Sequence, residues 1–208
     1  MQTLFPDSVL LIFCKAPIPG QVKTRLQPAL SAEQATQAHK QLTCMTLDRA
    51  FQQPLCAVEL HCAPDTGDEF FQDYARRYPV TLRTQHGSDL GERMQQAFED
   101  ALGRYRHALL MGCDCPSLSA DDLRCALTAL NQGHDAVIAP ADDGGYVMIG
   151  LNEAQPRLFS NMNWGHDQVM SSTRRRSEDI GLKVYELDSQ WDVDTYQDWQ
   201  RYLELTNR

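Results

Sequence analysis

The clearest indication of the fold is the segment Leu109-Leu110-Met111-Gly112-Cys113-Asp114-Cys115-Pro116-Ser117-Leu118. It begins as an apolar run, reaches a single carboxylate at Asp114 and is stopped by Pro116. An apolar run with helical patterns on both sides is typical of a buried central strand in an α/β sheet. Because proline cannot donate a hydrogen bond to a neighbouring strand, the strand must end before Pro116. The sequence therefore predicts that Asp114 lies at the carboxyl end of a buried strand.

That end of a strand is where ligands bind in open α/β sheets. Burying an ionised carboxylate there costs free energy unless a cation lies beside it. A divalent metal ion bound to a nucleotide phosphate would be such a cation. The alternative is that Asp114 caps the next helix, but Ser119 can fill that role, with Asp122 three residues further on. We therefore predict a catalytic, metal-binding role for Asp114.

The chain has 208 residues, which is enough for a sizeable core, and we assign residues 1–208 to a single domain. Its formal net charge of -9 argues against non-specific binding of nucleic acid or of acidic membranes. No stretch approaches the roughly 20 apolar residues of a membrane span. The N-terminal segment 1–8 has no basic residue ahead of the first apolar run, so a signal peptide is not expected.

The seven cysteines are an odd number without regular spacing, which predicts reduced thiols in a cytoplasmic protein. Cys113 and Cys115 flank Asp114 and would point to one face of the strand, an arrangement that invites a metal site. However, no second pair of cysteines or histidines follows at zinc-ligand spacing, so zinc is not favoured.

Hydrophobic periodicity predicts an α/β fold in which strands alternate with helices. The predicted strands are 9–13, 55–63, 80–84, the run from 109, 135–139, 146–151 and 182–187. The predicted helices are 31–51, 68–77, 90–101, 119–131 and 195–205. A β-α-β-α-β beginning is typical of a mostly parallel sheet. We therefore expect a three-layer α/β/α sandwich around a mostly parallel (mixed) central sheet.

A basic loop follows the first predicted strand. Pro17, Pro19 and Gly20 keep it irregular, and the cations in or beside it are Lys15, Lys23 and Arg25. A loop of this kind is suited to cradle phosphates, although Val22 stands where a P-loop has glycine before its lysine. If the loop is extended, Lys23 and Arg25 point the same way. We assign Lys15, Gly20, Lys23, Thr24 and Arg25 to nucleotide binding, and we expect Lys23 and Arg25 to be catalytic by stabilising charge on the leaving group. The alternative is a solvated loop with incidental charges.

Two further polar segments follow strands. Residues 85–93 lead into a helix, where Ser88 or Asp89 is a plausible N-cap, and we assign Asp89, Gly91 and Arg93 to nucleotide binding. Arg93 opposes the helix dipole there, which indicates either a nearby anion or simply an exposed arginine. Residues 140–146 are predicted to form a turn, since two adjacent glycines preceded by aspartate are common in the turns of β-hairpins.

The placement of this turn after the Asp114 unit favours a role on the acceptor side of a cleft. We assign to that side the turn residues and one tryptophan, which are Asp143, Gly144, Gly145, Tyr146 and Trp164. Asp194 lies just before the cap of the last helix, where the last strand exits. Four polar clusters thus follow strands, and in a doubly wound sheet all four would face one cleft: Lys23 with Arg25, residues 89–93, Asp114 and Asp194. Two carboxylates and a basic loop are what metal-assisted transfer from a nucleotide requires.

The chain resembles the nucleotide-diphospho-sugar transferase (GT-A) superfamily, and more closely a bacterial glycosyltransferase-like family related to 2-phospholactate guanylyltransferase. The family pattern F-x-K-x-P-x-x-G-x-x-K-T-R-L matches residues 13–26. The patterns D-L-G-x-R-M, G-x-D-x-P-x-L and D-G-G-Y-x-x-I-G-L follow in order, together with a phenylalanine and a later tryptophan, at 89–94, 112–118, 143–151, Phe159 and Trp164. Five motifs in the right order cover nearly the whole chain.

The resemblance implies a GT-A-type α/β sandwich in which Asp114 and Asp194 bind a divalent metal ion, Mg²⁺ or Mn²⁺, and Lys23 and Arg25 contact phosphate. The chain departs from the superfamily at Cys113-Asp114-Cys115, because GT-A glycosyltransferases usually carry D-x-D there. A single aspartate at this position is typical of nucleotidyltransferases.

Our first expectation is a metal-dependent glycosyltransferase-like enzyme that uses a nucleotide-sugar donor and a small-molecule acceptor. The alternative is a nucleotidyltransferase that joins an NTP to a phosphorylated or hydroxylated acceptor and releases pyrophosphate. The third possibility is a non-catalytic nucleotide-binding module, against which the presence of both Asp114 and Asp194 argues.

Overall fold

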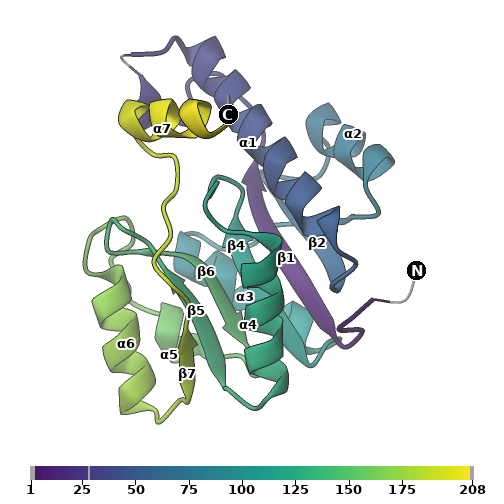
Figure 1. Cartoon of the computed structure of the whole chain (residues 1–208), viewed down its shortest axis with the longest axis vertical. Helices are drawn as coiled ribbons and strands as arrows, with labels where there is room; N and C mark the ends of the chain where they lie inside the picture. Colours follow the sequence, from purple (N-terminus) through teal and green to yellow (C-terminus); the bar gives the residue numbers. More distant parts are fainter. Residues whose placement is uncertain (1–2, 28, 207–208) are drawn as a thin grey trace.

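The protein forms one seven-stranded sheet with helices on both faces, as a computed structural model shows (Figure 1). The structure describes residues 3–27 and 29–206, so Met1 and Gln2, the start of the N-terminal segment discussed above, lie outside the described residues. The strand order is β3-β2-β1-β4-β6-β5-β7. Neighbouring strands run parallel except where β6 pairs with β4 and β5. The predicted three-layer sandwich with a mostly parallel, mixed sheet is confirmed.

The elements follow the predicted order. The strands are β1 (Ser8–Lys15), β2 (Ala57–Ala63), β3 (Thr81–Thr84), β4 (His107–Gly112), β5 (Ala136–Pro140), β6 (Tyr146–Leu151) and β7 (Val184–Glu186). The helices are η1 (Thr24–Leu26), α1 (Ala32–Gln52), α2 (Glu69–Arg77), α3 (Leu90–Leu102), α4 (Ala120–Asn131), α5 (Pro156–Phe159), α6 (Val169–Asp179) and α7 (Tyr196–Thr206). Within the described residues, no helix combines the length and the apolar composition needed to cross a membrane.

Helix α6 was not predicted, because its sequence is dominated by polar residues and hides the periodicity of a helix. Only its buried positions, among them Val169 and Met170, face the core. The starts of other helices were predicted from their caps. Ser31 and Ser119 each form a capping box with the residue three positions on, and Asp89, rather than Ser88, caps α3.

The core has one layer on each face of the sheet, because successive strand residues point to opposite faces. On β1, Leu10 and Ile12 pack with α1, α2 and α4, while Val9 and Leu11 pack with α3, α5 and α6. A smaller third cluster joins η1 and α1 to the C-terminal segment, which includes Trp191 and α7. Figure 1 shows α7 beside the N-terminal half of α1.

The connection from β7 to α7 determines where the functional carboxylates lie. It first follows the end of β5, where the backbone N–H of Gln190 donates to Pro140 O (2.8 Å). It then crosses to the end of β4, where the N–H of Val193 donates to Asp114 O (3.0 Å). The path is visible as the long connection that leads into the yellow helix in Figure 1. It carries residues 192 and 194 to the end of β4.

Gly91 in the first turn of α3 lets the segment around Trp164 pack against this helix. A Cβ added at Gly91 would lie 2.7 Å from Phe159 O and 2.7 Å from Trp164 Nε1. Such contacts are far inside van der Waals separation, so a side chain here would displace the tryptophan segment. The close approach gives a structural reason for glycine in the D-L-G motif.

We predict that Gly91→Ala destabilises the protein by about 1–3 kcal/mol, the usual cost of overpacking a well-packed site. Gly103→Ala is the matched control at the other end of α3, because Gly103 has an ordinary φ of -70° and a Cβ there would be no closer than 3.6 Å to its neighbours. The control should be neutral or slightly stabilising. Urea unfolding of both variants measures the difference, and equal stabilities would contradict the packing argument.

Candidate functional site

Asp114 stands directly beyond the end of β4, as the sequence predicted. The neighbouring Gly112 makes room for its carboxylate, because a Cβ at Gly112 would lie 2.8 Å from Asp114 Oδ1. The Asp114 side chain is 30% exposed. It therefore lies in a partly open position at the ligand-binding edge of the sheet.

Lys23 is the cation that meets Asp114. Its backbone is left-handed (φ 47°, ψ 40°), which turns the side chain inward from the loop after β1. The ammonium donates to Asp114 Oδ2 (2.6 Å) and to the carbonyl oxygen of Val193 (2.5 Å), and it lies 3.4 Å from Asp194 Oδ1. The lysine side chain is only 7% exposed. A strained loop residue thus joins the basic loop, the end of β4 and the C-terminal connection.

The ionisation of this pair follows from its burial and its charges. Burial alone lowers the pKa of Lys23, but Asp114 and then Asp194 outweigh it and hold the pKa above its ordinary value. Burial alone raises the pKa of Asp114, but Lys23 outweighs it and holds that pKa below its ordinary value. Both groups therefore carry their charges at neutral pH.

Arg25 completes the contacts of Asp194. Its Nη1 lies 2.7 Å from Asp194 Oδ2, and its side chain is 64% exposed. The expectation of an extended loop with Lys23 and Arg25 side by side is wrong in detail, because Lys23 is left-handed and residues 24–26 form a 3-10 turn. Lys23 is buried and Arg25 is exposed, yet both reach Asp194.

Asp192 is a third carboxylate that the sequence analysis did not select. One oxygen each of Asp114, Asp192 and Asp194 can be chosen so that all three lie within 4.8 Å of one another. The signal was present in the alternation Asp192-Val193-Asp194, which aims both carboxylates to one side of an extended segment. Burial, followed by repulsion from Asp114 and Asp194, raises the pKa of Asp192 to about 7.

The segments that carry these carboxylates are tied together by buried hydrogen bonds. Ser117 Oγ donates to Trp191 O (3.1 Å) and accepts from Trp191 N–H (2.9 Å). Cys115 Sγ also donates to Trp191 O (3.3 Å), so this thiol is used structurally. The carboxylate triad, which we define as Asp114, Asp192 and Asp194, therefore has a fixed frame.

A cleft of about 650 Å³ opens beside the triad. All four polar clusters of the sequence analysis contribute to it, and their residues in its lining are Lys15, Lys23, Thr24, Arg25, Asp89, Arg93, Asp114 and Asp194. Gly20 and Gly91, which were also assigned to nucleotide binding, lie outside this lining. Of the lining cations, Lys15 and Arg93 form no ion pair within residues 3–27 and 29–206.

A second cavity of about 230 Å³ adjoins the cleft, and the two share Asp114 and five other lining residues. Its wall includes Tyr146 and Trp164, whose ring planes are nearly perpendicular (87°) with centroids 6.3 Å apart. Asp143 lines both cavities, and Asp192 lines the smaller one. Of the residues assigned to the acceptor side, only Gly144 lies outside both linings.

A buried group of Cys14, His39 and Cys113 also borders the larger cleft, and no sequence pattern pointed to it. His39 Nε2 lies 2.8 Å from Lys15 O, so this nitrogen carries the proton and donates to the carbonyl. A metal ligand would need that nitrogen free of its proton or a turned ring. The group therefore acts as packing beneath the cleft in the described geometry.

The carboxylate triad has the chemistry of a divalent metal site. Carboxylate oxygens are the ligands that Mg²⁺ prefers, and the three carboxylates of the triad outnumber the two cations, Lys23 and Arg25, that contact them. Lys23 occupies Asp114 Oδ2, and Lys23 and Arg25 both contact Asp194. The oxygens with the fewest protein contacts are therefore those of Asp192 and Asp114 Oδ1, which fit a metal ion better than Asp194 does.

The chain belongs to the family described as "Uncharacterized protein conserved in bacteria (DUF2064)", whose model matches residues 46–166. A solved structure from Desulfovibrio desulfuricans G20, described as a "putative nucleotide-diphospho-sugar transferase", is 31% identical with a TM-score of 0.83. The match covers 92% of this chain and 84% of that one. A comparison with curated proteins gives no sequence match.

More distant solved structures share the fold. One is CMP:2-keto-3-deoxy-manno-octonic acid synthetase complexed with CTP, with 11% identity, a TM-score of 0.62 and coverage of 97% of this chain and 98% of that one. Another is 4-diphosphocytidyl-2C-methyl-D-erythritol synthase from Anaerococcus prevotii DSM 20548, with 14% identity, a TM-score of 0.65 and coverage of 98% and 97%. These likenesses establish that the chain has the fold of nucleotide-diphospho-sugar transferases and cytidylyltransferases.

The raised pKa of Asp192 predicts a pH effect on stability in chelator-treated protein. Because its folded-state pKa is about 7, folded Asp192 keeps a proton that the unfolded chain releases near pH 4. The unfolded state then binds fewer protons, so the contribution of Asp192 to the free energy of unfolding falls as pH rises from about 4 to about 7. The total fall from this group is on the order of a few kcal/mol.

Asp192→Asn should remove this part of the pH dependence. Between pH 4 and pH 8 the free energy of unfolding should therefore fall less in the variant than in the wild type. Urea unfolding at a series of pH values, with chelator throughout, measures the difference. Parallel profiles for the two proteins would show that Asp192 does not titrate in this way.

Proposed function

We propose that this protein is a metal-dependent transferase that takes a sugar from a nucleotide-sugar donor and passes it to a small-molecule acceptor. The observation that carries the proposal is the position of the carboxylate triad at the junction of two unlike cavities. Asp194 lines the cation-bearing cleft, Asp192 lines the aromatic cavity, and Asp114 lines both. A metal ion held there would touch the donor's diphosphate with the transferred group beyond it.

The donor side is supported by the cations of the larger cleft. Lys15 and Arg93 line it without an ion pair among the described residues, so they can contact phosphate oxygens directly. Lys23 is held by Asp114 and Val193, and Arg25 by Asp194. The role that we give Lys23 is therefore to hold the carboxylates in place, while Arg25 at the mouth of the cleft can reach an outer phosphate.

The acceptor side is supported by the smaller cavity. Its lining has the faces of Tyr146 and Trp164, several aliphatic side chains and three carboxylates, but neither lysine nor arginine. Aromatic rings with polar edges suit a ligand that has an apolar face and a hydrophilic edge, as a sugar ring has. An anionic group would meet three carboxylates there and, apart from His166, no basic side chain, which favours an uncharged, hydroxyl-bearing ring.

When bound, a divalent metal ion would stabilise the negative charge on the leaving nucleoside diphosphate. Asp114 and Asp192 would hold that ion, with Asp194 positioned through Lys23 and Arg25. Lys15 and Arg93 would orient the diphosphate, and the aromatic wall would orient the acceptor so that its hydroxyl faces the transferred sugar.

Nucleotidyl transfer with release of pyrophosphate is the second candidate. It is favoured by the full-length likeness to the cytidylyltransferase folds, by the single aspartate at Cys113-Asp114-Cys115 and by the motif resemblance to 2-phospholactate guanylyltransferase. Against it, a triphosphate needs several free cations, and two of those in the basic loop are already paired with carboxylates. The seven free cysteines support a reducing, cytoplasmic setting for either reaction.

We predict that the full chain, with Mn²⁺ or Mg²⁺, releases nucleoside diphosphate from one member of a panel of nucleotide sugars. The same protein should release no pyrophosphate from the four NTPs with a panel of hydroxylated and phosphorylated acceptors. The two products are measured with separate coupled assays. Pyrophosphate release without diphosphate release would establish the second candidate, and a chain that neither binds nor turns over any nucleotide would refute both.

Asp114→Asn and Asp192→Asn should each lower turnover by at least about a hundredfold, because each removes a charged oxygen ligand from the metal ion. Both substitutions preserve side-chain shape, and Lys23 keeps Asp194 and Val193 as partners when Asp114 is replaced. Asp121→Asn is the control, because Asp121 is an exposed residue whose partners within residues 3–27 and 29–206 are Arg124 and Gln53. Turnover that survives in both site variants would refute the metal site.

A further inference from the structure

A polar groove lies on the α3 side of the sheet, next to the larger cleft. At this face β1 contributes the apolar Val9 and Leu11, but β2 contributes Glu59 and His61. Glu59 is 2% exposed and His61 is 4% exposed. Burial of an ionised carboxylate and an imidazole where the next strand has aliphatic residues is costly, so these two residues call for a role.

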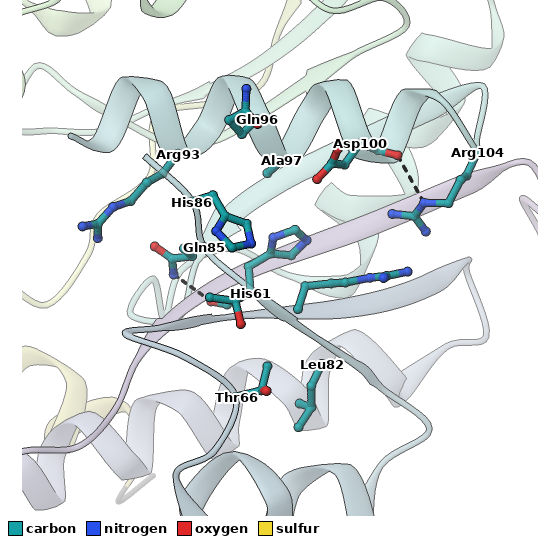
Figure 2. A pocket seen from close by; sticks show the side chains of 12 residues that line it. His61, Thr66, Leu82, Gln85, His86, Arg93, Gln96, Ala97, Asp100 and Arg104 are labelled. Carbon is teal, nitrogen blue, oxygen red and sulfur yellow. Dashed lines mark hydrogen bonds between the residues drawn. The ribbon is translucent and has the colours of Figure 1, made fainter. Parts of the chain in front are cut away.

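The groove has a volume of about 520 Å³ and runs between α3 and strands β2 and β3 (Figure 2). Figure 2 shows the imidazole of His61 directed from β2 toward α3, with His86 beside it. Arg93 and Arg104 lie at opposite ends of the helix face above. Arg83 from β3 also lines the groove.

The charges of the groove are only partly matched within the protein. Arg104 grips Glu59 with both terminal nitrogens (2.5 and 3.0 Å), and Arg83 Nε lies 3.6 Å from the same carboxylate. Burial alone raises the pKa of Glu59, but the neighbouring His61 and Arg104 lower it to about 2, so Glu59 stays ionised. One carboxylate thus serves two arginines.

Several donors are left over. In the described part of the chain, the terminal nitrogens of Arg83 and Arg93 donate to no protein acceptor, since Arg93 uses only its Nε, toward Gly87 O. The three arginines of the lining stand against two carboxylates, Asp100 in the lining and Glu59 beneath it. This is a local excess of positive charge in a chain whose net charge is -9.

His61 forms part of the floor of the groove. Its ring stacks on Phe13, with centroids 5.5 Å apart and planes 26° apart, which fixes its position. Its Nε2 is enclosed and lies 3.4 Å from Glu59 Oε2, so this nitrogen faces the buried carboxylate. The donors that face the groove are therefore those of the arginines.

We propose that this groove is a binding site for a small phosphate-bearing molecule, held without a metal ion. Phosphate oxygens match the planar donor forks of arginine, and the terminal nitrogens of Arg83 and Arg93 supply such donors. The site goes beyond the proposed transferase function, because it includes no member of the carboxylate triad. It meets the larger cleft at Gln85 and Arg93, which line both spaces.

The test is a titration of the full chain with inorganic phosphate, in chelator and at constant pH and ionic strength, followed through the imidazole resonances of its six histidines. We expect saturable shifts of His61 and His86, with His134 unmoved. A parallel titration with glycerol phosphate distinguishes a site for a phosphate ester, which then binds more tightly, from one for the free ion.

Arg83→Gln should weaken phosphate binding about tenfold or more, the value of one charge-assisted hydrogen bond. Arg174→Gln is the matched control, since Arg174 is 48% exposed against 46% for Arg83 and also pairs with a glutamate. Gln96→Glu, an exposed change on α3 that adds negative charge to the lining, should weaken binding as well and covers the case in which Arg83→Gln misfolds. Lys15→Ala should leave the His61 shift intact.

The proposal is overturned if phosphate moves only His39, which borders the larger cleft, or if no histidine shift saturates. It is also overturned if folded Arg83→Gln and Gln96→Glu both bind phosphate as the wild type does. Because the titration contains no metal ion and no nucleotide, its failure leaves the proposed transferase function untouched.

Discussion

The structure around the triad depends on the burial of one lysine ammonium. Lys23 holds Asp114, Asp194 and the Val193 carbonyl within hydrogen-bond or ion-pair distance, and these groups come from parts of the chain that are far apart in sequence. Removing one partner of such a buried pair leaves an uncompensated charge, which is strongly destabilising. The left-handed backbone of Lys23 is a local strain that these contacts offset. The loop after β1 is therefore fixed by what its lysine reaches.

The triad is assembled by a connection and not by strands alone. Asp114 follows β4 directly, whereas Asp192 and Asp194 lie on the extended segment after β7. This segment first pairs with the chain at the end of β5. This route divides the edge of the sheet into a cation-bearing cleft and an aromatic cavity with carboxylates between them. A group transfer needs two binding spaces of different chemistry around one centre of charge, and the division provides them.

The sequence predicted most of the fold because the signals were local. The buried run before Gly112, the capping boxes and the turn residues each act within a few positions, and they specify elements well. Helix α6 was not predicted, because its sequence is mostly polar and few of its side chains are buried. In the candidate site, position after a strand was sufficient to predict that Asp114 and Arg93 lie near one cleft, which both of them line. Asp192 and His61 were missed, since their importance arises from neighbours distant in sequence and from burial, which periodicity does not reveal.

The central claim is that a divalent metal ion binds between Asp114 and Asp192 at the junction of the two cavities. The most direct measurement is anomalous diffraction from crystals soaked with Mn²⁺ and a nucleoside diphosphate. The account predicts an anomalous peak within coordination distance of both carboxylates, with the diphosphate extending toward Lys15 and Arg93. A peak only at another site, or a diphosphate bound away from the triad, would contradict it.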